Sequence, residues 1–388
     1  MKIVHISNAL NHHSLPLALS FSRQKEVDYV YIETAPMNQR RAKMGWALKE
    51  DYGFVFKAYE NKEKEALKLV NEADVVIIGK APLRYIDERL KKDKLTFRAC
   101  ERLFKDGTSS RMFIKNICRV IKHRLINYQN KRLFYLCMSG YLAHDVNMFS
   151  NYKDKCLKWA YFVENRNLSF SSLKRNKTTT ILWAGRLLPW KHPDAAVRVA
   201  ISLKNENYPF QMNIIGDGEL KETLASTIQK NNLSDCVKLL GAMHPDKVRD
   251  HMEESDIFLF TSDFKEGWGV VLGEAMSSGC AVISSHACGS APFLINQGHN
   301  GFMYLSGSEK ELLDATKKLL DNLELRKKIA YTAFRDMRTL WDADSATQRL
   351  IQVVDAINNK KDYLMFGNGP LSQAPILNDD FYRKRYMI

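Results

Sequence analysis

The sequence lacks long apolar runs and paired cysteine motifs, and each absence excludes a class of protein. No apolar stretch approaches the ~18 residues that a transmembrane helix needs. The seven cysteines are odd in number and scattered, and none forms a C-x-x-C pair, so we expect no disulfide framework and no structural metal site. Met1 to Asn8 resembles a strand rather than a signal peptide, because charge and histidine interrupt it. A cytoplasmic protein is therefore expected.

Two motifs of nucleotide enzymes are also absent. No G-x-G-x-x-G follows the first expected strand, which argues against a dinucleotide dehydrogenase. No D-x-D lies at a strand end, and Asp342-Ala343-Asp344 resembles a helix start instead. We therefore expect no metal ion and no tightly bound cofactor.

Positive charge is concentrated in the first half of the chain. The net charge is +14 over 388 residues, and residues 1–170 contribute 31 Lys and Arg against 18 Asp and Glu, which is +13. The remaining residues contribute 27 against 26, which is +1. A basic lobe joined to a neutral lobe suggests a face that meets an anionic partner, such as nucleic acid, acidic lipid or a phosphorylated substrate.

Short β-branched and aromatic runs alternate with helical stretches, as in parallel βαβ units. In the first half the expected helices are Asn61–Ala73, Asp87–Lys92 and Ser109–Tyr128. The expected strands there are Lys2–Asn8, Val27–Thr34, Phe54–Tyr59, Asp74–Gly79, Leu95–Cys100, Arg132–Gly140 and Trp159–Glu164. In the second half the expected strands are Thr180–Gly185, Phe210–Gly216, Val237–Gly241, Ile257–Thr261, Ala281–Ser285 and Gly301–Leu305.

The polar stretch Ser171–Thr179 is the best candidate for a linker between two such sheets. We expect an N-terminal Rossmann-like domain over residues 1–170 and a second one over 171–345, with a cleft between them. Helical patterning continues from Ser308 to about Asn359, and Phe366–Ile388 looks irregular. Residues 346–388 would form a C-terminal helix and tail that could pack back on the N-terminal domain.

The strongest chemical feature is the segment 265–279, KEGWGVVLGEAMSSG. Gly267 and Gly269 allow close backbone approach before a helix that begins near Val270, so free N–H groups there can face an anion. Glu266 and Glu274 stand eight positions apart, too far for a close acid/base dyad. Taken alone, each glutamate could as well have no ligand, with Glu266 an ordinary loop acid and Glu274 a solvated residue in the first turn of the helix.

Segment 266–285 resembles the nucleotide-sugar site of retaining glycosyltransferase family 4, enzymes of GT-B fold. The similarity continues through 286–293 and 297–302, and upstream through Leu182 to Lys191, with its G-R-L and lysine, and through Ile214 to Gly218. It covers about residues 178–305. The resemblance implies an α/β protein with two doubly wound parallel-sheet domains that face each other across a cleft.

The resemblance also implies roles for individual residues. Arg186 and Lys191 would neutralise the departing diphosphate, and an arginine fork with a lysine point charge suits phosphate oxygens. Glu266 would contact the donor sugar, and Glu274 the ribose diol. The segment Gly267, Trp268, Gly269 and Val270 would present backbone amides to sugar and phosphate.

Two further turns carry weaker signals. Gly216 and Gly218 precede the helical run Glu219–Lys230 and could face a phosphate or form a plain tight turn. Ser14 precedes Pro16 as a possible helix cap, and His13 beside it could meet the diphosphate or acceptor. The family usually carries a glycine-rich turn here, and this sequence does not.

The sequence thus predicts a retaining, metal-independent glycosyltransferase that uses a UDP- or GDP-linked sugar and a glycan or lipid-linked acceptor in bacterial surface polysaccharide biosynthesis. Basic residues 111, 115, 119 and 122 lie along one stripe of an expected helix. This helix could bind the inner face of an anionic membrane, or it could be an ordinary core-facing helix with solvated basic residues. Nucleic acid is not expected, since no reading motif is present. The alternatives are a sugar-nucleotide epimerase or hydrolase of the same architecture and a catalytically silent partner subunit.

Overall fold

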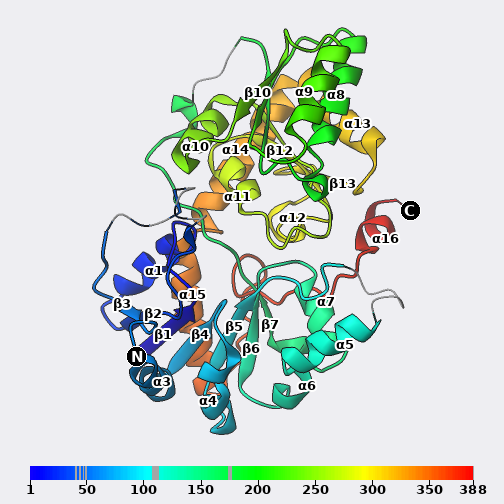
Figure 1. Cartoon of the computed structure of the whole chain (residues 1–388). Coiled ribbons are helices and arrows are strands. Elements are labelled where there is room, and N and C mark those ends of the chain that lie inside the picture. Colours follow the sequence, from blue (N-terminus) through cyan, green and yellow to red (C-terminus); the bar gives the residue numbers. More distant parts are fainter. Residues whose placement is uncertain are drawn as a thin grey trace. The chain divides into compact units, whose positions relative to one another are not determined.

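The computed structural model describes residues 1–39, 42, 45, 46, 48, 50–106, 113–173 and 177–387. The chain divides into two compact units, each of which is drawn in Figure 1. Unit 1 contains Met1–Glu164 and Trp341–Asn378, and unit 2 contains Asn165–Leu340 and Asp379–Ile388. From the sequence, the domain boundaries are expected after residues 170 and 345. The chain thus changes unit three times, and its last residues belong to unit 2.

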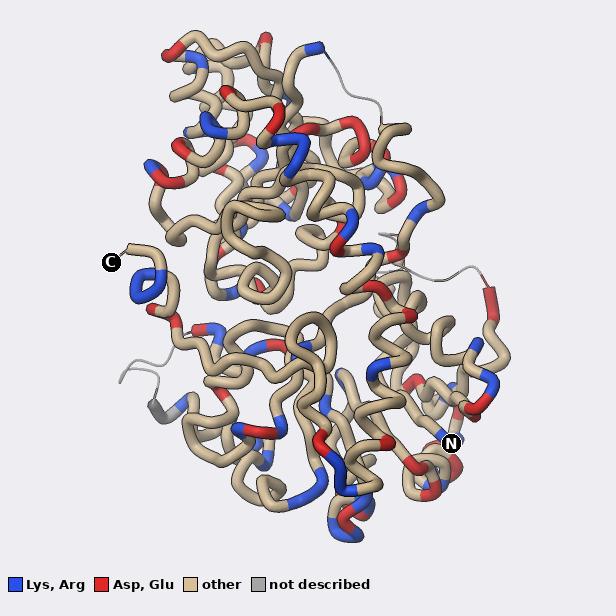
Figure 2. The backbone as a smooth tube through the Cα atoms, turned by 180° about the vertical axis from the view of Figure 1, so that it is seen from behind, with Lys and Arg blue, Asp and Glu red and all other residues tan. Residues whose placement is uncertain are grey.

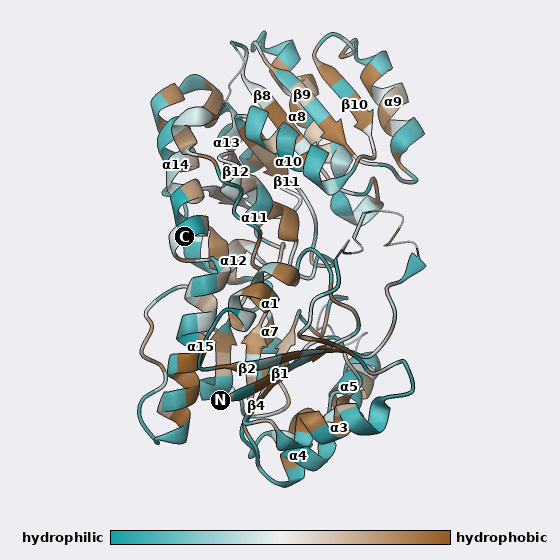
Figure 3. Cartoon of the chain, turned by 90° about the vertical axis from the view of Figure 1, so that its left-hand side faces the viewer, coloured by the Kyte–Doolittle hydropathy of each residue, from teal (hydrophilic) through white to brown (hydrophobic). Residues whose placement is uncertain are grey.

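Unit 1 is built on a seven-stranded parallel sheet in the order β3-β2-β1-β4-β5-β6-β7. Strand residues such as those of β4 and β6 are buried throughout, because helices cover both faces of a parallel sheet. In Figure 3, brown hydrophobic residues concentrate on strands β1, β2 and β4. The strands are β1 Lys2–Ser7, β2 Asp28–Glu33, β3 Val55–Lys57, β4 Val75–Ile78, β5 Thr96–Cys100, β6 Leu133–Cys137 and β7 Cys156–Lys158.

The helices of unit 1 include one that comes from the end of the chain. Helix α15 (Ala343–Asn358) packs on α1 (Leu15–Ser22), where Asp344 accepts hydrogen bonds from Ser20 Oγ at 2.5 Å and Arg23 Nη2 at 2.8 Å. Asp342 caps α15 by accepting from the N–H groups of residues 344 and 345. The other helices are α3 Glu63–Glu72, η1 Leu83–Tyr85, α4 Asp87–Lys91, α5 Phe113–Lys122, α6 Leu125–Tyr128, α7 Leu142–Asn147 and η3 Lys153–Lys155.

Unit 2 contains a six-stranded parallel sheet in the order β10-β9-β8-β11-β12-β13. Its strands are β8 Thr180–Ala184, β9 Gln211–Ile215, β10 Val237–Gly241, β11 Ile257–Phe260, β12 Ala281–Ser285 and β13 Phe302–Tyr304. Its helices are η4 Phe170–Ser172, η5 Pro189–Lys191, α8 Pro193–Asn205, α9 Lys221–Lys230, α10 Pro245–Glu254, α11 Val270–Ser277, α12 Ala291–Leu294, α13 Glu309–Asp321, α14 Leu323–Thr339 and α16 Phe381–Tyr386. Among the residues that the structure describes, no helix is both long and apolar enough to span a membrane.

Three sequence predictions need correction. The segment Trp159–Glu164 is not a strand. Strand β7 ends just before it at Lys158, because the neighbouring strand β6 ends at Cys137 and has no further residues with which this segment could pair. The helix expected over Ser109–Tyr128 is interrupted at Arg124, whose φ of 51° separates α5 from α6, while residues 107–112 lie outside the described residues. The tail is not wholly irregular, since it contains α16.

Each sheet reverses its strand order at one point. In the first sheet this point lies between β1 and β4, and in the second between β8 and β11. The connections on either side of such a point leave in opposite directions and open a crevice at the carboxyl ends of the two strands, where open α/β sheets bind ligands. The loops after β8 and β11 are therefore the candidate ligand-binding loops of unit 2.

The buried side chain of Arg89 is expected to stabilise unit 1, and a substitution can test this. Its side chain is fully buried, burial lowers its pKa to about 10, and it donates to backbone carbonyls of residues 70, 73, 74 and 95. Arg89→Leu should lower the free energy of unfolding by about 3–5 kcal/mol, because buried carbonyls lose their donors. Urea titration followed by circular dichroism measures this loss.

The control is Arg84→Leu, which removes an exposed ion pair to Glu63 (2.9 Å) and should cost no more than about 1 kcal/mol. Equal effects of the two substitutions would contradict the structural role of Arg89.

Candidate functional site

Two loops meet at the point where the second sheet reverses. The loop after β8 runs through η5 to His192, and the loop after β11 begins at Thr261. The Thr261 hydroxyl lies 2.7 and 2.9 Å from the carbonyl oxygens of Lys191 and His192, and accepts from Trp183 Nε1 at 2.8 Å. The N–H of Asp263 donates to the carbonyl of Trp190 at 3.0 Å. These bonds join the two loops into one body.

A buried ion pair joins the same loops. Lys191 Nζ pairs with Glu266 Oε2, and the two side chains are only 13% and 11% exposed. Ser262 Oγ donates to the same carboxylate oxygen at 3.1 Å. The ammonium also lies 4.5 Å from the centre of the Trp190 ring, a cation–π distance. The structure therefore fixes Lys191 and Glu266, two predicted site residues, against each other.

Arg186 is an exposed cation of this site. Its guanidinium lies 5.8 Å from the Trp190 ring, and it forms no ion pair within the described residues. Because Lys191 is paired with Glu266, the exposed cations of the two loops are Arg186 and Lys265. Its planar fork is available for a phosphate.

His192 and Asp263 extend the polar surroundings of the pair. The Nε2 of His192 lies 3.5 Å from Asp263 Oδ2, and this hydrogen bond raises the pKa of His192. Asp263 also accepts from the N–H of Lys265 at 2.8 Å. Neither His192 nor Asp263 was predicted from the sequence, although His192 directly follows Lys191 and Asp263 lies three residues before Glu266.

The glycine turn 216–218 packs backbone to backbone on the Arg186 loop. A Cβ on Gly216 would lie 1.8 Å from the carbonyl oxygen of Gly185, and one on Gly218 would lie 2.5 Å from that of Leu187. The N–H of Leu187 donates to the carbonyl of Asp217 at 3.0 Å. Both glycines are therefore needed for this close approach, whatever ligand faces the turn.

The segment 267–270 leads into α11. Gly269 stands at the N-cap with a φ of 81°, and a Cβ there would lie 2.3 Å from the Phe260 ring. The Trp268 side chain is buried and packs on Phe293, so only its backbone could serve a ligand. Val270 begins the helix as expected, and Glu274 is half-buried on its second turn.

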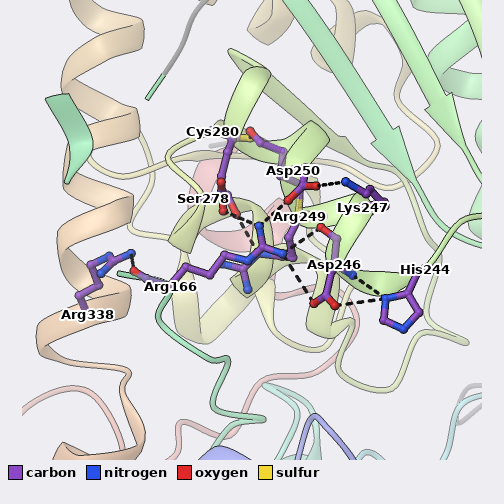
Figure 4. Close-up of polar contacts among 11 residues, drawn as sticks. Arg166, His244, Asp246, Lys247, Arg249, Asp250, Ser278, Cys280 and Arg338 are labelled. Carbon is purple, nitrogen blue, oxygen red and sulfur yellow. Dashed lines mark hydrogen bonds and ion pairs between the residues drawn. The ribbon is translucent and has the colours of Figure 1, made fainter. Parts of the chain in front are cut away.

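Helix α11 is held at its far end by a polar cluster (Figure 4). Arg249 Nε donates to Ser278 Oγ at 2.9 Å, and Ser277 Oγ donates to Asn165 at 3.0 Å. Arg166 pairs with Asp250 at 2.7 Å. Helix α11, which carries Glu274, is thus attached both to α10 and to the segment that enters unit 2.

His13 belongs to unit 1, whereas the other predicted site residues belong to unit 2. Its ring lies 3.7 Å from that of His12, 5.0 Å from Trp46 and 6.2 Å from Tyr161. Ser14 occupies the N-cap position of α1, but its side chain makes no capping bond and donates to the carbonyl of Asn11 instead. His13 follows β1, at the reversal point of the first sheet.

Several contributors to the site were not found from the sequence. Thr261 and Ser262 directly follow an apolar strand, and polar residues at that position are a usable signal. Trp190 lies inside the motif that ends at Lys191 but was not assigned a contact. Within the described ranges, no group of three or more His, Cys, Asp or Glu side chains could hold a metal ion.

A comparison with protein families gives a match in unit 2. Residues 164–336 match the family model described as glycosyl transferases group 1. That range contains both loops, the glycine turn and α11.

Two curated relatives are similar over part of their length. The amylovoran biosynthesis glycosyltransferase AmsK of Erwinia amylovora is 34% identical over 137 residues, 34% of this chain and 33% of the relative. The N-acetylgalactosamine-N,N'-diacetylbacillosaminyl-diphospho-undecaprenol 4-alpha-N-acetylgalactosaminyltransferase of Campylobacter jejuni is 27% identical over 225 residues, 57% of this chain and 60% of the relative. The chain thus spans a third to three fifths of these relatives.

Among solved structures, HepE of Anabaena in complex with UDP is similar with a TM-score of 0.65 and 14% identity. The match covers 92% of this chain and all of that chain. This likeness shows the fold, which is the GT-B fold of two parallel-sheet α/β domains, as expected from the sequence.

Gly216→Ala tests the close approach of the two turns. We expect a loss of about 1–3 kcal/mol in the stability of unit 2, because a Cβ would collide with the Gly185 carbonyl. Chemical denaturation measures the loss. Gly241→Ala is the matched control: its φ is also positive at 74°, but nothing lies within 4 Å of an added Cβ. A smaller loss in Gly216→Ala than in the control would contradict the contact.

Proposed function

We propose that this chain is a glycosyltransferase that moves a sugar from a nucleoside diphosphate sugar to a hydroxyl group of an acceptor. The observation that carries the proposal is the pair of loops at the reversal of the second sheet. There an exposed arginine adjoins a buried lysine–glutamate pair, inside the segment that matches the glycosyl transferases group 1 model. HepE, which shares the fold, was solved in complex with UDP, and this supports a nucleotide as the ligand.

The donor would be held in unit 2. Arg186 and Lys191 would bind the diphosphate, and the N–H groups at the start of α11 would add donors to the same anion. Glu266 would accept hydrogen bonds from sugar hydroxyls, and Glu274 from the ribose diol. UDP and GDP are equally compatible with these contacts.

We propose that the reaction retains the anomeric configuration and needs no metal ion. The bond between the anomeric carbon and the phosphate oxygen breaks, and the acceptor oxygen bonds to the same face of that carbon. The acceptor proton passes to an oxygen of the departing diphosphate. Catalysis then comes from positioning and from stabilisation of the charge that develops on the phosphate, chiefly by Arg186 and Lys191.

A glycan or lipid-linked acceptor is proposed for the basic first part of the chain. The name of the Campylobacter relative specifies a diphospho-undecaprenol acceptor, and that of AmsK specifies amylovoran biosynthesis. An anionic acceptor or membrane surface would match the excess of +13 over residues 1–170. We propose from these names and this charge that the chain acts in surface polysaccharide synthesis on the cytoplasmic face of a membrane.

Glu274→Ala tests the ribose contact. A thermal-shift screen against UDP- and GDP-sugars first identifies the nucleotide, since a ligand of the native state raises its stability. Calorimetric titration of that nucleoside diphosphate should then show a Kd about 10–100-fold higher in the variant, the effect of losing hydrogen bonds to a charged group. Glu254→Ala, which removes an exposed carboxylate, is the control. Unchanged affinity in Glu274→Ala would remove Glu274 from the site.

Arg186→Gln tests charge stabilisation without disturbing the fold. Because Arg186 is exposed and has no ion pair in the described structure, its loss should leave the melting temperature unchanged. Turnover of donor and acceptor should fall about 10²-fold or more, as for other charge-stabilising groups. Arg335→Gln, at an exposed site on α14, should be neutral.

Lys191→Ala is a less specific variant, because it leaves the buried Glu266 carboxylate without its cation and so also costs stability. Normal turnover in a folded Arg186→Gln enzyme would contradict the proposed mechanism.

A further inference from the structure

The last residues of the chain dock on unit 2 through one buried histidine. The chain re-enters unit 2 at Asp379 and forms α16, the red helix of Figure 1. The rings of Phe381 and Tyr382 are buried, with centroids 5.9 and 5.1 Å from the ring of His286. His286 directly follows β12, the neighbour of β11 in the sheet.

The hydroxyl of Tyr382 adds polar anchors to this contact. It donates to the carbonyl of Met303 at 2.9 Å and lies 3.1 Å from Glu311 Oε2. The same carboxylate oxygen accepts from the N–H of Leu305 at 2.9 Å. The tail is therefore attached to β13 and α13 by specific bonds as well as by apolar packing.

The bonds of His286 define its protonation state. Its Nδ1 accepts from the N–H of Ser306 at 2.9 Å, so a neutral ring carries its proton on Nε2 and donates it to the carbonyl of Asp379 at 3.4 Å. Burial lowers the pKa of His286, which favours this neutral form. One ring thus bonds the β13 turn on one side and the tail on the other.

The same ring also contacts the candidate site. The edge of His286 meets Phe264 at 5.4 Å between centroids and an interplanar angle of 88°. Phe264 lies in the loop after β11, two residues before Glu266. Two residues after His286, Cys288 Sγ donates to the carbonyl of Ser262 at 3.4 Å, in the same loop. The loop that carries the ion pair therefore contacts both the loop after β8 and the His286 segment.

We propose that His286 is a positioning residue that transmits the docking of the C-terminal tail to the loop 262–269, and so sets the affinity for the nucleotide. The consequence for affinity rests on the proposed function. With the tail docked, Phe264 has a fixed partner and Glu266 is held against Lys191. With the tail released, the ring of His286 loses the Asp379 carbonyl and two aromatic neighbours, and the loop opens more often.

The exposed face of α16 provides a readout of docking. Arg383, Lys384 and Arg385 are exposed, and Figure 2 shows basic residues on this helix beside the C-terminal end. Trypsin needs an unfolded segment around its cleavage site, so these residues are cut quickly only when the tail is released.

The experiment compares three full-length variants with the wild-type chain. His286→Leu keeps an apolar side chain but loses both hydrogen bonds. His286→Gln can accept from Ser306 through Oε1 and donate to Asp379 through Nε2, so it should rescue tail docking, but it lacks the ring that meets Phe264. Tyr382→Ser weakens the tail from its own side, and Tyr331→Ser, at an exposed tyrosine on α14, is its control. Tryptic release of the tail, amide hydrogen exchange of residues 262–269 and the Kd for UDP and GDP are measured for each.

We expect His286→Leu and Tyr382→Ser to speed tail cleavage and loop exchange about tenfold and to raise the nucleotide Kd about fivefold or more, with the control near wild type. His286→Gln should be near wild type in tail cleavage but should still speed loop exchange, because Phe264 loses its ring partner. Tail release with unchanged loop exchange would overturn the proposal, as would unchanged cleavage in His286→Leu. Faster exchange with an unchanged Kd would overturn the link to affinity. If the wild-type chain binds no nucleoside diphosphate, the proposed function fails, while exchange still decides whether His286 positions the loop.

Discussion

The buried ion pair between Lys191 and Glu266 is the interaction on which the candidate site depends. Two charges that are nearly excluded from water are stable only with each other and with further hydrogen bonds. Ser262 and the Trp190 ring supply those additional contacts. Because the partners come from different loops, the pair fixes the loop after β8 relative to the loop after β11.

The backbone imposes a second constraint. Three glycines, Gly216, Gly218 and Gly269, stand where any side chain would collide with a carbonyl or a ring. Glycine at these positions therefore lets the turn 216–218 pack on the backbone of the Arg186 loop, and lets the start of α11 pack on the Phe260 ring. These contacts explain why glycine is needed at fixed positions in both turns. By contrast, the bulky Trp268, which lies between Gly267 and Gly269, is buried.

Local patterns were enough to predict most of the fold, because parallel strands are apolar runs between helices. Twelve expected strands from Lys2–Asn8 to Gly301–Leu305 coincide with strands of the structure, and the start of α11 near Val270 is confirmed. The failures share a cause. The segment Trp159–Glu164 is as apolar as a strand, but β6 ends too early to pair with it. Similarly, the break at Arg124 depends on one left-handed residue that no periodicity predicts.

Contacts over long separations could not be derived from the sequence. Glu266 lies 75 residues from Lys191 along the chain, and Tyr382 lies 71 residues from Glu311. A pattern identifies residue types suited to a ligand, but not whether two opposite charges neutralise each other. Here the sequence motif contained both Arg186 and Lys191 as cations, and only the structure distinguishes the exposed one from the paired one.

This distinction changes the electrostatic argument for donor binding. The second half of the chain carries a net charge of only +1, so its overall field attracts an anion weakly. Since lysine and glutamate offset each other at a distance, attraction would come from the exposed Arg186 and Lys265. Lys191 would add a direct contact once the anion is bound, and all of these charges act within the ~8–10 Å over which salt screens charges. Selectivity for a diphosphate would then come from short, directed hydrogen bonds and not from long-range steering. The strong positive charge of residues 1–170 would then act on the proposed acceptor, because attraction between separated charges depends more on range than on direction.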